Sequence, residues 1–365
     1  MTACPPGQKI IEELLSAIAA DGILSTEQNE KARRYLFDVG HRHGSRNAGA
    51  GLYPRSLWSS ELQWRGLPAL IEQSWQTEPP SLYGRFDLAY NGTGPPKLLE
   101  YNADTPTSLL EAAVVQWYWL EDVFPQCDQF NCMHPRLVDR WRELAGRLPR
   151  QRLHFCSTDD AEDGMTVTYL LETAQQAGLT ASISPIDEIG WNGAAFVDPQ
   201  EEPLKAIFKL YPWECMVREE FGKFIETAGT IWIEPPWKML LSNKGILPIL
   251  WELYPGHPNL LEAHFDVPGQ LQYWAGKPML GREGANVAVH SPDGDWSSEG
   301  SYGAEGFVFQ DLARIKSFDG KFPVIGSWMV GDAASGVGIR ESSTPITTNS
   351  SQFVPHLFDR LKAEC

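Results

Sequence analysis

The sequence lacks the features that mark membrane proteins and disulfide-stabilised secreted proteins. Its 365 residues contain no run of about 18 apolar residues, the length that a membrane-spanning helix requires. The first residues have no apolar core of the kind that a secretory signal carries. The six cysteines are dispersed through a long chain, which does not indicate a disulfide framework. We therefore expect a soluble, cytoplasmic protein.

Basic residues are also scarce. There are 30 Lys and Arg against 47 Asp and Glu, which gives a formal net charge of −17. Such a surface repels the phosphates of nucleic acids and anionic lipids. We therefore expect neither a nucleic acid nor a membrane as a partner, whereas a cationic small molecule is mildly favoured.

Several common catalytic and nucleotide-binding motifs are absent as well. The chain has no Walker-A sequence, no G-x-G-x-x-G that follows a strand, and no G-x-S-x-G. These absences argue against a P-loop enzyme, a dinucleotide-binding enzyme and a serine hydrolase. The function must be sought in other patterns.

The segment from residue 82 to 103 has the pattern of a β-hairpin. Asn91–Pro96 is rich in the turn-forming residues Gly, Pro and Asn, and the flanking segments Leu82–Tyr90 and Lys97–Ala103 alternate in strand fashion. A hairpin that is symmetric about the loop places Leu88 opposite Leu99 on an apolar face. This register assumes that the hairpin has no bulge.

The other face of this hairpin carries the most informative side chains. The same register places Asp87 opposite Glu100 and Arg85 opposite Asn102. Two carboxylates that are cross-strand neighbours repel each other unless a cation lies between them. Oxygen ligands suit Mg²⁺, and an arginine suits a phosphate. The face is either a metal–phosphate site or an ordinary solvated surface.

The rest of the chain divides into three regions by pattern. Helices are predicted within residues 8–48 and over 108–124. Near residue 150 a strand–helix–strand order begins, which predicts a small α/β unit with a parallel sheet over about 150–235. We therefore expect domains at 1–149, 150–235 and 236–365, and the Gly-rich segment 277–300 is a candidate lid.

An acidic loop follows the first strand of the predicted α/β unit. It contains Asp159, Asp160, Glu162 and Asp163. Ligands of open α/β sheets bind beyond the carboxyl ends of the strands, so the loop is a candidate substrate site. Acidic residues also favour a helix N-terminus through the helix dipole, and the pattern does not distinguish the two interpretations.

Several motifs along residues 80–350 resemble those of the glutathionylspermidine synthase family. They are R-F-D, E-Y-N-A-D-T, E-P-P-W-K-M-L-L-S-N-K-G-I-L-P-I-L-W-E-L, K-P-M-L-G-R-E-G-A-N-V and G-V-G-I-R-E-S. The resemblance implies an α+β protein with an ATP-grasp type fold and a pre-grasp-like α/β substrate subdomain. The carboxylate hairpin precedes the lysine motifs here, so the implied arrangement is a permuted one.

The resemblance also implies roles for individual residues. Mg²⁺ ligands are implied at Asp87, Glu100 and Asn102. ATP-binding positions are implied at Arg85, Asp87, Lys244, Lys277, Gln310, Asp311, Leu312 and Ala313. Catalytic arginines that act on phosphate are implied at Arg85 and Arg340, and substrate-binding residues at Thr105, Glu162 and Asp163.

The implied activity is that of an ATP-dependent, ADP-forming carboxylate–amine ligase. Such an enzyme uses ATP and Mg²⁺ to form an amide through an acyl phosphate, here from a small-molecule acid such as glutathione and an amine such as spermidine. Two alternatives stay open. One is a non-catalytic protein that binds a nucleotide or a polyamine, and the other is an ATP-dependent kinase of a small molecule.

Overall fold

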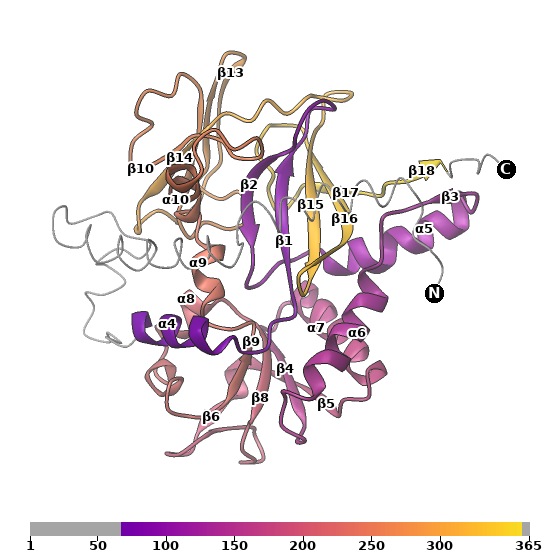
Figure 1. Ribbon diagram of the computed structural model, residues 1–365, viewed down its shortest axis with the longest axis vertical. Helices are drawn as coiled ribbons and strands as arrows, with labels where there is room; N and C mark the ends of the chain where they lie inside the picture. The colour runs from indigo at the N-terminus through magenta and orange to yellow at the C-terminus, as the bar shows by residue number, and fades with distance from the viewer. Residues whose placement is uncertain (1–66, 360–365) are drawn as a thin grey trace.

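The computed structural model describes residues 67–359. The helices predicted within residues 8–48 lie outside the described residues. Within the described range the chain forms three main sheets with helices packed against them, which confirms a mixed α+β fold (Figure 1).

The central sheet has five antiparallel strands in the order β17-β16-β15-β1-β2. Their bounds are β1 Tyr83–Ala89, β2 Lys97–Asn102, β15 Phe322–Val330, β16 Ala333–Ser342 and β17 Gln352–Val354. The predicted hairpin is β1–β2, and it pairs through β1 with a second hairpin near the end of the chain. The central sheet therefore combines strands from the first and third of the predicted domains.

The register of β1 and β2 agrees with the sequence prediction up to one bulge. Arg85 pairs with Asn102, and Asp87 pairs with Glu100. Between Asp87 and Leu88 the register shifts, so that Leu88 pairs with Leu98 and not with Leu99, as the symmetric hairpin predicted. The bulge leaves one extra residue on β2.

The second sheet is antiparallel, in the order β10-β14-β11-β12-β13. Its strands are β10 Ala263–Phe265, β11 Trp274–Pro278, β12 Ala288–Ser291, β13 Gly294–Ser297 and β14 Phe307–Asp311. Helix α10, Ile246–Leu253, packs against β10 and β14. The Gly-rich segment 277–300 comprises the end of β11, the loop after it, and strands β12 and β13.

The third sheet is parallel and confirms the predicted α/β unit. Its strand order is β5-β4-β8-β9, with β4 Leu153–Ser157, β5 Ala181–Pro185, β8 Ala206–Leu210 and β9 Ile231–Ile233. Helices α6, Met133–Ala145, and α7, Ala161–Gln176, pack against each other beside it (Figure 1). Trp141, Phe155 and Phe208 are completely buried between these elements.

The remaining elements connect the three sheets. They are α4 Leu67–Thr77, the π-helix Glu111–Val115, α5 Gln116–Val123, α8 Trp213–Met216, α9 Lys238–Ser242, the 3₁₀ turns Ile186–Glu188 and Gly222–Phe224, and the short strands β3 Cys127–Asp128, β6 Gly190–Trp191, β7 Phe196–Val197 and β18 Phe358–Asp359. The helix predicted over 108–124 is therefore present, with a π-helical turn inside it.

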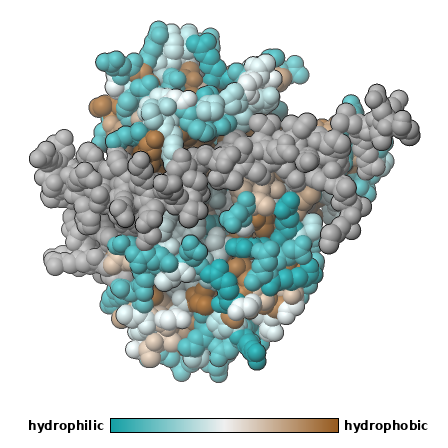
Figure 2. Space-filling view, in the orientation of Figure 1, coloured by the Kyte–Doolittle hydropathy of each residue, from teal (hydrophilic) through white to brown (hydrophobic). Residues whose placement is uncertain are grey.

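The described surface visible in Figure 2 is mainly hydrophilic, with scattered hydrophobic residues. None of the helices in residues 67–359 combines the length and apolar character that would let it traverse a bilayer.

Candidate active site

The polar face of the β1–β2 hairpin holds the predicted cluster together. Arg85 binds Asp87 through two bonds, Nε to Oδ1 at 2.6 Å and Nη2 to Oδ2 at 2.9 Å. The Asn102 amide nitrogen donates to an oxygen of Asp87 and to an oxygen of Glu100, both at 3.1 Å. The four side chains thus form one connected group, as strand alternation and the register predicted.

The surroundings of the two carboxylates of this group shift their pKa values in opposite directions. Burial and the charge of Glu100 raise the pKa of Asp87 above its usual range, although Arg85 opposes this change. Burial alone would also raise the pKa of Glu100, but Lys244 and Lys277 lower it overall. The pair therefore carries closely spaced negative charge that requires cations nearby.

Two buried lysines come from distant segments to this carboxylate pair. Lys244 Nζ lies 2.8 Å from Glu100 Oε2 and 2.6 Å from the Gly281 carbonyl oxygen. Lys277 Nζ donates to the carbonyl oxygen of Leu99, the extra residue of the bulge, at 3.0 Å. Burial lowers the pKa of Lys277 to about 8.

The implied ATP-binding segment 310–313 adjoins these lysines. Gln310 is buried at the end of β14, where its Oε1 accepts from Lys277 Nζ at 2.8 Å and its Nε2 donates to the Leu98 carbonyl at 2.8 Å. One pocket of about 120 Å³ is lined by the following predicted residues: Asp87, Glu100, Lys244, Lys277, Gln310, Asp311, Leu312 and Ala313. The structure therefore brings these eight predicted residues to one pocket, whereas Arg85 and Asn102 are not among the residues that line it.

Apolar side chains complete this pocket. Ala275 lines it from β11, Val287 from the position before β12, and Val289 from β12 itself. Val324 and Ile346 line it from the C-terminal segments. A pocket with apolar walls and a few charged groups at one end is typical of ligand sites in general.

The two predicted arginines meet in a small adjoining cavity. Arg85, Asp87 and Arg340 line it together with Ser108 and Trp328. Burial, followed by the charge of Arg85, lowers the pKa of Arg340, although Asp87, Glu162 and Glu283 oppose this change. An anionic group between the two arginines would relieve their repulsion.

Arg85 is more constrained than the sequence indicated. Besides its two bonds to Asp87, its Nη1 donates to the Thr107 carbonyl at 2.5 Å. In this structure Arg85 therefore fixes the orientation of Asp87.

Two residues that the sequence prediction missed lie beside Thr105. Arg282 Nη1 donates to the Thr105 hydroxyl at 2.6 Å, and Arg282 Nη2 donates to Glu214 Oε1 at 2.5 Å. The ion pair with Arg282 outweighs the effect of burial and lowers the pKa of Glu214. Arg282 lies in the Gly-rich segment 277–300, where only the glycines indicated a function. No sequence pattern around Glu214 indicated a functional residue.

The predicted acidic pair occupies the first turn of α7. Asp160 is the N-cap, and its carboxylate accepts from the backbone nitrogens of Glu162 and Asp163 at 2.9 and 3.2 Å, so Asp160 has the helix-capping role. Burial, followed by the charges of Glu111 and Glu283, raises the pKa of Glu162. Glu162 also interacts electrostatically with Arg340.

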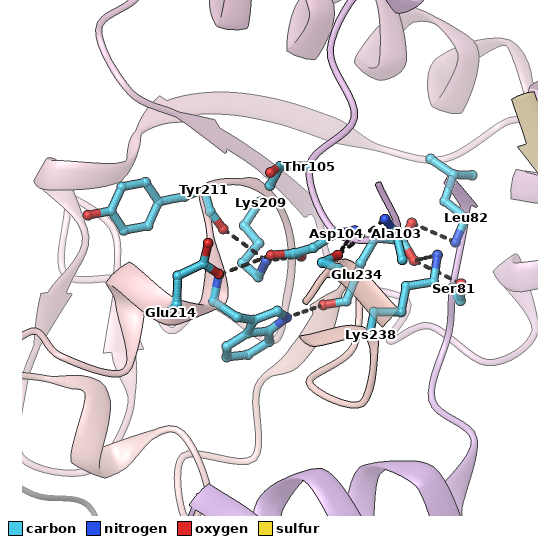
Figure 3. Close-up of polar contacts among 12 residues, drawn as sticks. Ser81, Leu82, Ala103, Asp104, Thr105, Lys209, Tyr211, Glu214, Glu234 and Lys238 are labelled. Atoms are coloured by element: carbon cyan, nitrogen blue, oxygen red, sulfur yellow. Dashed lines mark hydrogen bonds and ion pairs between the residues drawn. The ribbon is translucent and has the colours of Figure 1, made fainter. Parts of the chain in front are cut away.

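Two buried ion pairs join the central sheet to the parallel sheet behind the site (Figure 3). Lys209 Nζ lies 2.6 Å from Asp104 Oδ1, and both side chains are essentially inaccessible to solvent. Lys238 Nζ lies 2.6 Å from Glu234, which also accepts from the backbone nitrogens of Leu82 and Tyr83. Asp104 directly precedes Thr105 in the chain, so the first pair holds the backbone next to Thr105 in place.

The donor set of the hairpin is suited to a divalent ion. Asp87 and Glu100 supply carboxylate oxygens from directly opposite positions, and hard cations such as Mg²⁺ prefer oxygen ligands of this kind. Within residues 67–359 no group of three or more His, Cys, Asp and Glu side chains is gathered as a metal site. Asp87 and Glu100 are two carboxylates, which is the number that Mg²⁺ commonly uses alongside phosphate oxygens.

A pocket that gathers two lysines and paired carboxylates among apolar side chains, with two arginines in the adjoining cavity, is suited to a phosphate-containing ligand, and it defines an enzyme-like site. Residues 64–359 match the family model described as glutathionylspermidine synthase preATP-grasp. The chain therefore belongs to the glutathionylspermidine synthase family, as its motifs predicted.

Three proteins with similar sequences support the same family assignment. The chain is 46% identical over 305 residues to a Haemophilus influenzae protein named "Putative acid--amine ligase", a match that covers 79% of this chain and 77% of the relative. It is 31% identical to trypanothione synthetase of Crithidia fasciculata over 78% of this chain and 48% of that one. It is 27% identical to the bifunctional glutathionylspermidine synthetase/amidase of Escherichia coli over 78% of this chain and 51% of that one.

These relatives are named as a ligase and as synthetases, and the predicted enzyme class, an acid–amine ligase, is confirmed at this level. The chain spans about half the length of the last two relatives. Among solved structures, a glutathione synthetase like-effector from Globodera pallida superposes with a TM-score of 0.50 at 8% identity, covering 97% of this chain and 99% of that one. At this identity the similarity concerns the fold alone.

Proposed function

We propose that this protein is an ADP-forming acid–amine ligase with a permuted ATP-grasp type fold. The observation that carries the proposal is the meeting of Lys244, Lys277 and the Asp87–Glu100 pair in one pocket with apolar walls. These groups come from three separate segments of the chain. Apolar side chains of similar volume would stabilise this region at least as well as buried charges do, so the convergence has no evident structural purpose.

The pocket suits ATP in a defined orientation. Residues 310–313 line the pocket and would run along the adenine, while Lys244 and Lys277 would contact the phosphates. Phosphate oxygens would replace the carbonyl oxygens that now accept from the two lysines. Nearby phosphate charge would also favour the protonated form of Lys277, which burial disfavours.

Asp87, Glu100 and Asn102 would hold Mg²⁺. The ion would offset charge on the phosphate oxygens and help to align them. Arg85 already holds the Asp87 carboxylate in a fixed orientation through two bonds, which is the role of a residue that supports a ligand.

The first chemical step would take place near the two arginines. A carboxylate oxygen of the acid attacks the γ-phosphorus of ATP, the bond to the β–γ bridging oxygen breaks, and ADP leaves. The products of this step are ADP and an acyl phosphate. Arg340, half-buried and next to Arg85, would stabilise the charge on the transferred group.

The acid would be positioned by Thr105 and by Arg282. Both side chains are already in contact through the hydroxyl of Thr105. Arg282 offers a planar fork that matches a carboxylate, and Glu214 occupies that fork in this structure.

The second step consumes the acyl phosphate. Glu162 or Asp163 would bind the ammonium form of the amine and accept one proton, which frees the nitrogen lone pair. The nitrogen then attacks the acyl carbon, the C–O bond to phosphate breaks, and inorganic phosphate leaves with the second proton of the nitrogen. The segment 277–300, which includes Arg282, would act as a lid that excludes water from the acyl phosphate.

The named relatives suggest candidates for both substrates. Glutathione is proposed as the acid and spermidine as one candidate amine, because the names of the relatives refer to products of this kind. Localisation in the cytoplasm and the division into domains at 149/150 and 235/236 stay predictions.

The test is an assay of ADP release with ATP, Mg²⁺ and a panel of acids and amines. We expect release that requires both an acid and an amine in wild type, and that falls at least about a hundredfold in Lys244→Met. Lys223→Met is the matched control, because Lys223 is exposed and lies outside the pocket. Release that needs no amine would identify a kinase, and nucleotide binding without release would identify a binding protein.

A further inference from the structure

Two side-chain hydrogen bonds join the second sheet to the central sheet next to the proposed metal ligands. The two sheets meet at β2, the edge strand of the central sheet (Figure 1). Consecutive carbonyl oxygens of β2 accept at this junction, that of Leu98 from Gln310 and that of Leu99 from Lys277. The bulge leaves Leu99 without a partner on β1, so its carbonyl oxygen can serve the second sheet.

Gln310 and Lys277 lie on the same face of the second sheet. Gln310 pairs with Ala275, and Lys277 follows Ala275 by two residues on β11, so strand alternation directs both side chains to one side. Both residues are buried. Gln310 Oε1 accepts from Lys277 Nζ at 2.8 Å, and Gln310 Nε2 donates to the Leu98 carbonyl oxygen at 2.8 Å. Each polar atom of the amide therefore has a partner within the protein.

The chemistry of these two partners fixes the orientation of the amide. A carbonyl oxygen can only accept a hydrogen bond, and an ammonium group can only donate one. The amide nitrogen must therefore face Leu98 and the amide oxygen must face Lys277, because the reverse orientation would lose both hydrogen bonds. Gln310 thus presents a fixed acceptor to the lysine.

This acceptor prepares Lys277 for a ligand. An ammonium group has three donors, and in the described part of the chain two of them are used by Gln310 Oε1 and the Leu99 carbonyl oxygen. One donor is left for a phosphate oxygen in the pocket that Lys277 lines. A lysine side chain that is already held in place loses less conformational freedom when a phosphate binds.

We propose that Gln310 is a positioning residue for phosphoryl transfer, which orients the ammonium group of Lys277 toward the phosphates of the nucleotide. The inference rests on the proposed function for the identity of the ligand. It leaves the backbone of residues 310–313 along the adenine and assigns the side chain of Gln310 to the phosphate end of the pocket. The side chain acts through Lys277 and does not contact the base.

The binding test separates the phosphates from the base. Competition against a fluorescent ATP analogue gives the dissociation constants of adenosine and of the non-hydrolysable analogue AMPPNP, each with Mg²⁺. Gln310→Met keeps the length of the side chain but removes the acceptor for Lys277. It should weaken AMPPNP binding at least about tenfold and adenosine binding less than about twofold. An equal loss for both ligands would assign the side chain to the base and overturn the inference, as would an unchanged affinity for AMPPNP.

A double-variant cycle tests whether Gln310 acts through Lys277. In a Lys277→Met background there is no ammonium group to orient, so adding Gln310→Met should weaken AMPPNP binding by less than about a further twofold. A tenfold loss that persists in this background would contradict the inference, because a glutamine that only joined the two sheets would act independently of the lysine. Gln352→Met is the matched control, since Gln352 is exposed on β17 and lines neither pocket of the site. It should leave both affinities unchanged.

A second variant keeps the test independent of effects on folding. Gln310→Met leaves the Leu98 carbonyl oxygen without its donor, which lowers stability. Gln310→Asn retains a buried amide, but it is one methylene shorter and cannot reach both partners. It should also weaken AMPPNP binding more than adenosine binding, and thermal unfolding checks that each variant is folded. Wild-type affinities in Gln310→Asn would contradict the inference.

Failure of this inference and failure of the proposed function give different results. ADP release by wild type with the panel of acids and amines tests the proposed function, and release that needs no amine would contradict it. Amine-dependent release together with equal losses of AMPPNP and adenosine affinity in Gln310→Met would contradict only the role of Gln310. Wild-type protein that does not bind AMPPNP would contradict both.

Discussion

The buried Lys209–Asp104 pair offers the sharpest test of how the site is supported. Both side chains are inaccessible, their charged atoms are 2.6 Å apart, and Lys209 also donates to the Tyr211 carbonyl at 2.9 Å. Asp104 accepts in addition from the Trp213 backbone nitrogen at 3.0 Å. Lys209→Met would keep much of the volume but leave Asp104 as a buried charge with one remaining partner (Figure 3).

Breaking such a pair by removing one partner costs about 3–5 kcal/mol. This loss is a large share of the 5–15 kcal/mol that is usual for folded proteins. The double variant Asp104→Asn/Lys209→Met has no unpaired charge and should be more stable than Lys209→Met alone. The measurement is urea unfolding at pH 7, followed by tryptophan fluorescence.

A surface pair provides the matched control. Arg142 and Asp139 also lie 2.6 Å apart, but their side chains are 57% and 65% exposed. Arg142→Met should therefore change the free energy of unfolding by no more than about 0.5 kcal/mol. A cost below about 1 kcal/mol for Lys209→Met, or a double variant less stable than it, would refute the reasoning.

The pH dependence of the same variant gives an independent check. Burial raises the pKa of Asp104, and Lys209 is the main group that lowers it again. Without Lys209, the folded state binds a proton at a higher pH than the unfolded state does. The cost of Lys209→Met should therefore be smaller at pH 5 than at pH 8, and a cost that grows with acidity would contradict this assignment.

Three further predictions follow from single contacts. Glu214→Gln removes the charge that holds Arg282, so steady-state kinetics should show a larger change in the KM for the acid than in the KM for ATP. An unchanged KM for the acid would count against this role. Gly284→Ala should lower stability in thermal unfolding by about 2 kcal/mol, because Gly284 has φ +66° and its Cβ would lie 2.1 Å from the Thr347 carbonyl oxygen; a neutral effect would show that the loop adapts freely. Burial lowers the pKa of His356 to about 4, so its contribution to stability is complete above pH 6.5 and is lost as the pH falls towards 4, by up to about 3 kcal/mol. Urea unfolding of wild type and His356→Gln between pH 4 and 7 should show a shallower decline in the variant, and parallel declines would disprove this origin.

The hairpin was predictable because its information is local. A turn-rich loop and a period of two determine which side chains share a face, so Asp87 and Glu100 could be paired from sequence. The bulge after Asp87 could not, because it depends on pairing in the folded sheet, where Lys277 binds the carbonyl of the extra residue.

The positions of the two lysines and of Arg282, by contrast, could not be predicted from local sequence patterns. Lys244 and Lys277 were assigned only through the resemblance of their motifs, since no local pattern relates them to a hairpin more than 130 residues earlier. The contact between Arg282, Thr105 and Glu214 unites three segments that are remote in sequence. Tertiary packing alone creates that contact, so the residues carry no local signal for it.

The central claim is that one pocket holds the nucleotide phosphates and a divalent ion. The most direct test is a crystal structure of the full chain with Mg²⁺ and a non-hydrolysable ATP analogue. We predict phosphates in contact with Lys244 and Lys277, Mg²⁺ bound to oxygens of Asp87 and Glu100, and adenine beside residues 310–313. A nucleotide bound elsewhere, or an ion that contacts neither carboxylate, would contradict the account.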